Sequence, residues 1–165
     1  MATPTNLPAT FVAGNVLTAA QQNDLRGAFR VLQVVEGTTS TVTSSTTSTY
    51  ADTTLTATIT PQSTSSKILA FANHSVCQKT VASLANRIDL RLVRSATTIG
   101  QVTSQFFTNS TVDQRGGITL IKLDSPATTS AVTYKTQFAN GGNTSSVAVQ
   151  VDSSLSTLIL MEISA

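Results

Sequence analysis

The sequence is poor in charge, and this limits the partners it can have. Only 11% of the 165 residues are charged, whereas ordinary soluble domains carry about 25%. The net charge of +2, from scattered Lys and Arg, is too small to indicate a nucleic-acid partner, and no Trp is present to stack on bases. Few charges also leave strand edges without their usual protection against association. We therefore expect an oligomer rather than a free monomer.

Cysteine and histidine are equally scarce. The single cysteine, Cys77, excludes an intrachain disulfide framework and a multi-cysteine zinc site, and we interpret it as a small buried hydrophobic residue. His74 is the only histidine, so a Ser-His-Asp or Cys-His site would have to use it. Residues three apart on a strand face opposite sides, so we do not expect His74 and Cys77 to pair. A histidine metal site would require three chains meeting on an axis.

Motifs for catalysis are also absent. The sequence has no Gly-x-Ser-x-Gly elbow and no phosphate-binding glycine loop, and its carboxylates are singly spaced. We interpret Asp89, between Arg87 and Arg91, as a cross-strand charge partner. Glu162 is expected at a sheet edge or an interface, with a buried paired carboxylate as the alternative. We predict that the protein is not an enzyme and binds no cofactor and no metal.

No segment resembles a targeting signal. The N-terminus lacks the basic and apolar regions of a signal peptide, and no apolar run is long enough to span a bilayer. We therefore predict synthesis in a cytoplasm without a signal peptide, and no membrane insertion. The sequons at Asn73, Asn109 and Asn143 are interpreted as coincidences in a Ser/Thr-rich chain.

Short β-strands are what the sequence does contain. The nearly unbroken apolar run Leu155–Ile163 predicts a strand in the middle of a sheet, covered on both faces, with a short buried helix as the alternative. In Arg87–Arg94 apolar and charged residues alternate, as in a strand with one solvent-facing side. Further predicted strands are Val31–Val35, Tyr50–Ile59, Lys67–Cys77, Thr97–Ser104, Gly117–Leu123, Val132–Phe138 and Val147–Val151.

The strand count predicts the fold class. Turn signals such as Asp124-Ser-Pro126 and Asn140-Gly-Gly-Asn143 separate the runs. About eight to ten short strands indicate an all-β protein, a jelly-roll-like antiparallel β-sandwich over residues 47–165. Residues 37–46 form a Ser/Thr-rich connection, and the stretch up to Thr49 fits either a flexible tether or an edge strand.

Residues 1–36 are predicted to be an N-terminal docking unit, made of an extended arm, one short α-helix and a first strand. Thr18 and Gln21 have the spacing of a capping box, and an apolar stripe follows over Ala19–Arg30. Gly27 weakens this helix, so it needs a surface to lie on. We predict docking on a partner protein, with packing on its own sandwich as the alternative. The predicted buried contacts are Phe11, Val16, Leu17, Leu25 and Phe29.

Two blocks of the sequence resemble known proteins. Phe11-Val-Ala-Gly-Asn-Val-Leu-Thr-Ala-Ala-Gln-Gln-Asn23 resembles a short N-terminal motif of tailed-phage virion proteins. The later segments resemble the small β-sandwich modules of the same proteins, which are similar to the trimeric jelly rolls of the tumour-necrosis-factor and complement-C1q type. These segments are Ser48–Asp52, Leu55–Ser66, Lys67–Leu69, Arg91–Arg94 and Ser156–Ile163.

The resemblance implies a bacteriophage structural protein on the virion surface. It would be a homotrimer that docks through its N-terminal arm on a capsid or tail component, as a short tail fiber, spike or capsid decoration. The alternative is a receptor- or glycan-binding module at a tail-fibre tip, serving host attachment. Its loops would present amide and charged side chains from Asn109, Asp113, Arg115, Asn140 and Asn143.

Overall fold

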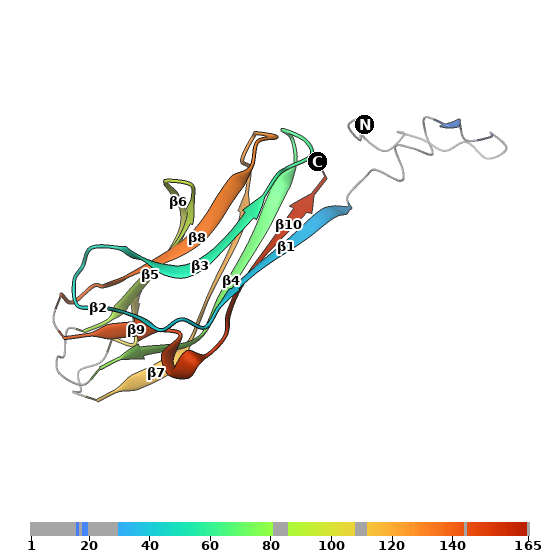
Figure 1. Cartoon of the computed structure of the whole chain (residues 1–165). Helices are drawn as coiled ribbons and strands as arrows, with labels where there is room; N and C mark the ends of the chain where they lie inside the picture. The colour runs from blue at the N-terminus through green and yellow to red at the C-terminus, as the bar shows by residue number, and fades with distance from the viewer. Residues whose placement is uncertain are drawn as a thin grey trace.

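The computed structural model describes residues 16, 18–19, 30–80, 86–107, 112–143 and 145–164, which form two antiparallel sheets packed face to face (Figure 1). Sheet A contains β1 (Val31–Thr39), β2 (Thr43–Ser45), β4 (Lys67–Lys79), β7 (Gln114–Asp124), β9 (Val147–Val149) and β10 (Ser156–Ile163). Sheet B contains β3 (Ala51–Ile59), β5 (Ile88–Arg94), β6 (Thr97–Gln105) and β8 (Val132–Asn140). A 3-10 turn, Val151–Ser153, joins β9 to β10.

The strand pairing is that of a jelly roll. The pairs β1–β10, β3–β8, β4–β7 and β5–β6 are nested within one another along the chain. Successive pairs alternate between sheet A and sheet B, as they do when one long hairpin is folded across two layers. This order confirms the predicted all-β, jelly-roll-like sandwich.

Each of the nine predicted strands is present, with some differences at the ends. β10 lies between β1 and β4, which confirms its central position. Its burial alternates between buried and half-buried residues, so the prediction that both faces are covered is wrong for a single chain. The reason is the two-layer architecture, in which one face of each sheet packs on the core and the other points outward.

The Ser/Thr-rich stretch belongs in part to sheet A. β1 continues to Thr39 and pairs with β10, and β2 pairs with β9 as a short edge strand. The described sandwich therefore includes residues before position 47. The predicted helix over Ala19–Arg30 lies outside the described residues, except for its two end positions.

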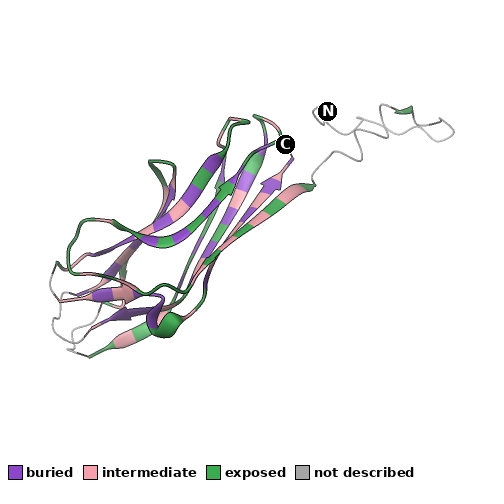
Figure 2. Cartoon of the chain, viewed as in Figure 1, coloured by how far each residue is buried: buried purple, intermediate pink, exposed green. Residues whose placement is uncertain are grey.

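Alternation along the strands builds the core between the sheets (Figure 2). Fully burying a Leu, Ile or Phe side chain stabilises the fold by roughly 1.5–3 kcal/mol relative to leaving it exposed. Sheet A contributes Ile68, Leu158 and Leu160, and sheet B contributes Leu55, Ile59, Ile88, Leu90, Leu92, Tyr134 and Phe138, all with less than 2% of their surface exposed.

Gly37 allows β1 to close one side of the sandwich. β1 belongs to sheet A but passes close to β3 of sheet B. A Cβ atom at Gly37 would collide with the backbone carbonyl oxygen of Thr56, so a larger residue would force the strands apart. The glycine is thus required by the close approach of two backbones.

The sandwich has two distinct ends. At the entry end, the backbone N–H of Arg30 donates to Ser164 Oγ at 3.0 Å, and the Ser164 N–H donates to the Arg30 carbonyl at 3.0 Å. The chain therefore enters and leaves the sandwich side by side. At the opposite, distal end lie the C-terminal ends of β4, β6 and β8 (Figure 1).

Candidate functional site

The outer face of sheet A carries an exposed patch of apolar side chains. Strand register places Val34, Met161, Leu69 and Leu123 in one row across β1, β10, β4 and β7. The next row contains Glu36, Ile159, Phe71 and Ile121. Large exposed fractions remain in this chain, 57% for Val34, 62% for Ile121 and 54% for Leu123.

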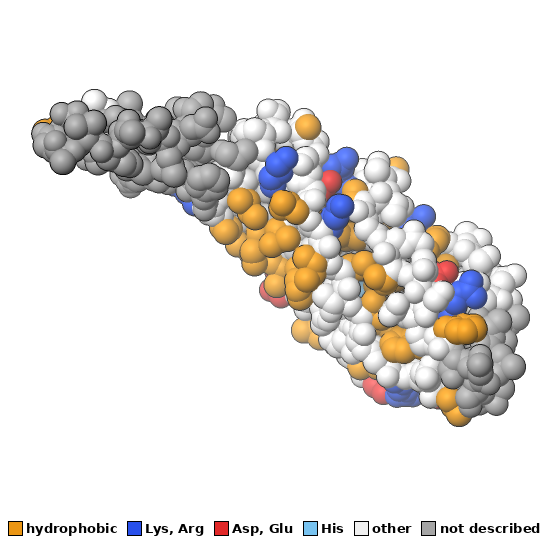
Figure 3. Space-filling model, turned by 180° about the vertical axis from the view of Figure 1, so that it is seen from behind, with side chains coloured by type: hydrophobic (Ala, Val, Ile, Leu, Met, Phe, Trp, Pro, Cys, Tyr) orange, Lys and Arg blue, Asp and Glu red, His pale blue; other side chains and the backbone are white. Residues whose placement is uncertain are grey.

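We call this patch the apolar face; it comprises Val34, Leu69, Phe71, Ile121, Leu123, Ile159 and Met161. It occupies the half of sheet A nearest the entry end. The next row towards the distal end is polar and marks where the patch stops; it contains Thr38, Thr157, Asn73 and Thr119. Figure 3 shows hydrophobic side chains gathered on this side of the molecule. Contiguous apolar surface of this kind marks an interaction site more often than scattered single residues do.

The second feature is a polar network inside the sandwich, centred on His74. The His74 ring on β4 contacts Thr136 Oγ1 of β8 at 3.0 Å through Nε2, and Thr136 Oγ1 lies 2.5 Å from Thr53 Oγ1 of β3. On the other side of the ring, the Gln150 side-chain oxygen lies 2.8 Å from Nδ1 and 3.1 Å from Ser156 Oγ. All five side chains are fully buried, so this network joins sheet A to sheet B within the core.

The direction of these hydrogen bonds fixes the form of the histidine. The Gln150 amide is satisfied when its nitrogen donates to the Thr53 and Thr41 carbonyls and its oxygen accepts from His74 Nδ1. Nδ1 then carries the proton and donates to Gln150. Nε2 of a neutral ring is an acceptor, and the Thr136 hydroxyl donates to it. The Thr53 hydroxyl lies within hydrogen-bond distance of both the carbonyl and the hydroxyl of Thr136. Every member is satisfied with a neutral ring. Burial lowers the pKa of His74 to about 4, in agreement with this arrangement.

Cys77 and His74 do not form a nucleophile–base pair. The prediction that they face opposite sides is wrong, because β4 changes register between them and both side chains are buried. Both ring nitrogens of His74 are nevertheless engaged by Thr136 and Gln150. Burial raises the pKa of the Cys77 thiol to about 12, so the reactive thiolate is not populated near neutral pH. The enclosed ring also cannot serve a metal shared between chains.

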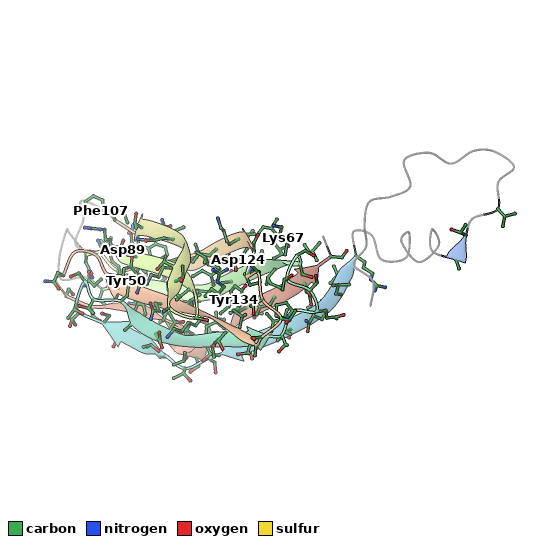
Figure 4. All side chains as sticks on the ribbon, turned by 90° about the horizontal axis from the view of Figure 1, so that it is seen from above. Tyr50, Lys67, Asp89, Phe107, Asp124 and Tyr134 are labelled. Carbon is green, nitrogen blue, oxygen red and sulfur yellow. The ribbon has the colours of Figure 1, made fainter. Side chains whose placement is uncertain are left out.

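Buried polar groups tie the entry end together (Figure 4). The Tyr134 hydroxyl donates to Asp124 Oδ2 at 2.7 Å, and Arg94 Nη1 donates to the same carboxylate at 2.8 Å. Burial, with Asp124 adding to it, raises the pKa of Tyr134 above its ordinary value. These contacts connect β5, β7 and β8, and they leave the phenol neutral.

Glu162 departs from its predicted position. It is fully buried rather than at an edge or interface, and its carboxylate accepts from the Gln62 backbone N–H at 2.7 Å and from Gln33 Nε2 at 2.6 Å. These bonds connect β10 to β1 and to the turn that follows β3. Glu162 is therefore a structural carboxylate of the entry end.

Of the predicted docking residues, only Val16 is described, and it is 92% exposed. Phe11, Leu17, Leu25 and Phe29 lie outside the described residues. The structure neither places them together nor separates them, so their role stays a prediction.

The predicted receptor-facing residues divide into two groups. Asp113 and Arg115 are exposed near the start of β7, where Arg115 Nη1 contacts Asp152 Oδ2 at 2.6 Å, and Asn143 is exposed while its Oδ1 accepts from the Ser48 N–H. Asn140 is fully buried, so its predicted outward position is wrong. Its amide donates to the Ser145 carbonyl and its Oδ1 accepts from the Gly142 N–H, which holds the turn. Asn109 lies outside the described residues.

The sequence analysis did not find the apolar face or the buried network. The apolar face required knowledge of which strands are neighbours, although the apolar residues of 119–123 and 157–163 were visible. The network combines residues from four strands and a turn, and no spacing in the sequence indicates that His74, Thr136 and Gln150 meet.

Searches of known proteins do not extend these observations. No protein-family model matches this chain, and no curated protein matches it. Within the described ranges, no helix has the length and apolarity needed to cross a bilayer, and no three potential metal-ligating His, Cys, Asp or Glu residues gather.

Proposed function

We propose that the protein is a non-enzymatic structural subunit of a phage virion, which assembles into a homotrimer and docks on the particle through its N-terminal segment. The observation that carries this proposal is the apolar face of sheet A. Seven apolar side chains that point away from the core need a cover, and a second copy of the chain is the cover that an oligomer supplies.

The position of the apolar face suggests how the subunit would be oriented on the particle. It adjoins the entry end, where Arg30 joins the sandwich, while β4, β6 and β8 end at the distal end. An assembly through this face would hold its docking segments together at one end and display its loops at the other. Three weak docking segments acting together bind far more firmly than one.

The oligomer is tested by measuring mass in solution with matched lysine variants. We expect the wild-type protein to have three times the 17.2 kDa chain mass, and the double variant Ile121→Lys/Leu123→Lys to be a folded monomer. The control is Thr58→Lys, on the exposed outer face of sheet B, which should remain a trimer. A wild-type chain that is monomeric at micromolar concentration, or an unaffected double variant, contradicts the proposed interface.

The virion role is tested separately. Removing residues 1–29 leaves all ten strands and the Arg30–Ser164 hydrogen bonds intact, so the truncated chain should keep its melting temperature and its oligomeric state. We expect it to be missing from purified particles, while the full chain is located on the particle surface by electron microscopy. Incorporation of the truncated chain at the normal level would rule out docking through this segment.

A further inference from the structure

The outer face of sheet B presents one row of polar side chains in register. Asp52 of β3, Gln137 of β8, Arg91 of β5 and Gln101 of β6 are successive neighbours across the sheet. Their side chains point away from the core, since Leu90 and Leu92, on either side of Arg91, are fully buried. Tyr50, just before β3, completes this group, which we call the Arg91 row.

Contacts from two sides hold the guanidinium of Arg91 in one orientation. Its Nε donates to Gln137 Oε1 at 2.8 Å, and its central carbon lies 4.0 Å from the centroid of the Tyr50 ring. The Tyr50 hydroxyl in turn accepts from Gln101 Nε2 at 2.8 Å. The cost of ordering a long side chain has therefore been met before any ligand arrives.

The neighbouring carboxylates are already engaged elsewhere. Asp52 accepts from Lys135 Nζ at 2.9 Å and from Gln137 Nε2 at 2.6 Å. Asp89 accepts from the Ser104 N–H at 2.7 Å, with Arg87 Nε 3.9 Å away (Figure 4). Among the described residues, no acceptor is hydrogen-bonded to Nη1 or Nη2 of Arg91. These two nitrogens form a planar pair of donors that matches a carboxylate.

The surroundings favour a sugar as the bearer of that carboxylate. Beside the guanidinium, the outer face of sheet B offers the side-chain oxygen of Gln101 and the Tyr50 ring. In the described parts of β3, β5, β6 and β8 no large hydrophobic side chain is exposed, so the face lacks the apolar centre of a protein interface. Amide groups and an aromatic ring beside one fixed cation suit an anion that carries hydroxyls.

We propose that the outer face of sheet B binds a carboxylate-bearing saccharide, with the carboxylate on Nη1 and Nη2 of Arg91. The side-chain oxygen of Gln101 would accept from a sugar hydroxyl. This site is independent of the apolar face, because it lies on the opposite sheet. It would give a surface-displayed subunit the ability to recognise acidic polysaccharide.

The test is a titration of the full-length protein with sodium glucuronate, observed by NMR at the Arg91 Nε–Hε group. We expect a saturable shift with a Kd of about 1–10 mM, in the range of a weak single-ring ligand. Glucose and, at equal ionic strength, sodium chloride should give no saturable shift. The shift of the Arg115 Nε–Hε group, an exposed arginine paired with Asp152, serves as the internal control.

A conservative substitution separates the contribution of the paired Arg91 donors from the contribution of the positive charge. Arg91→Lys keeps the charge but removes the paired donors, and its glucuronate binding, followed at the Tyr50 ring, should weaken at least about tenfold. Arg115→Lys should bind as the wild type does. The proposal is overturned if glucuronate gives no saturable shift, if glucose gives the same shift, or if Arg91→Lys binds unchanged. Trimer mass and particle incorporation are unaffected by any of these results, so failure here is distinct from failure of the proposed function.

Discussion

The two outer faces of this sandwich differ, although one alternating pattern builds both sheets. On sheet A the outward positions hold Leu69, Phe71 and Ile121, whereas on sheet B they hold Asp52, Arg91 and Lys135. The inward positions of both sheets are mostly apolar, apart from the network around His74. Alternation therefore specifies which side faces the core, while the identity of the outward residue specifies what that face meets in the assembled protein.

The largest expected effect separates an inward from an outward position and uses two neighbouring residues on β7. Leu120 points into the core and is 6% exposed, while Ile121 points outward and is 62% exposed. Leu120→Ala should lower the free energy of unfolding by about 2–5 kcal/mol, because it leaves a cavity. Ile121→Ala should change it by less than about 1 kcal/mol in the dissociated chain.

The measurement is denaturant unfolding at a concentration where the chain is monomeric, since association would add to the apparent stability. In a second assay, which measures the dissociation constant of the oligomer, Ile121→Ala should have the larger effect. Ile121→Ala should raise the dissociation constant of the oligomer, whereas Leu120→Ala should leave it nearly unchanged in the folded fraction. Equal unfolding losses would mean that the outward position is also part of the core.

The buried His74 predicts that the free energy of unfolding depends on pH. The pKa of His74 falls from its ordinary 6.5 to about 4 on folding, so between these values the unfolded chain binds more protons. The contribution of the neutral ring is fully present above pH 6.5 and is lost as the pH falls towards 4. From pH 7 to pH 4.5 this group should lower the free energy of unfolding by about 2–3 kcal/mol.

Carboxylates titrate in the same region, so the measurement compares wild type with His74→Gln. The variant should be less stable at pH 7, because its amide cannot reach both Thr136 and Gln150, but its stability should change less between pH 7 and pH 4.5. Identical pH dependence in the two proteins would mean that the ring is not held neutral by burial.

The sequence predicted the strands and the fold class because those depend on local alternation and turn residues. Arg87–Arg94 and Val132–Phe138 appear as β5 and β8 nearly unchanged. Asn140 and Glu162 were misplaced for a different reason. Each is polar in a sequence context that predicts exposure, yet each is buried. Asn140 is held inside its own turn by Gly142 and Ser145. Glu162 is buried where its hydrogen-bond partners, Gln33 and Gln62, come from distant positions in the chain. Partners of this kind follow from topology and cannot be found by spacing.

The site residues show the same division. The register that aligns Val34 with Met161, Leu69 and Leu123 arises only when β1, β10, β4 and β7 are neighbours. The stacking of Arg91 on Tyr50 joins β5 to a residue about forty positions earlier in the chain, just before β3. Sequence alternation indicated that Arg91 is on an outward face, but not which side chains fix it there.

The smallest effect is expected on the polar face, and it sharpens the contrast between the two sheets. Asp52 is exposed, with 52% of its side chain accessible, and pairs with Lys135 Nζ at 2.9 Å. Lys135 and Gln137 lower the pKa of Asp52 through hydrogen bonds, although partial burial acts in the opposite direction. Water and salt screen such a pair, so Asp52→Asn should lower the free energy of unfolding by less than about 1 kcal/mol.

This loss of stability should shrink further in 1 M NaCl. The comparison variant is Asp124→Asn, which deprives buried Tyr134 and half-buried Arg94 of a carboxylate. It should lower the free energy of unfolding more and respond less to salt. Chemical denaturation of both variants in urea at low and high salt distinguishes the two cases. If Asp52→Asn proved as costly as Asp124→Asn, the outer face of sheet B would be a structural network rather than a surface available to a ligand.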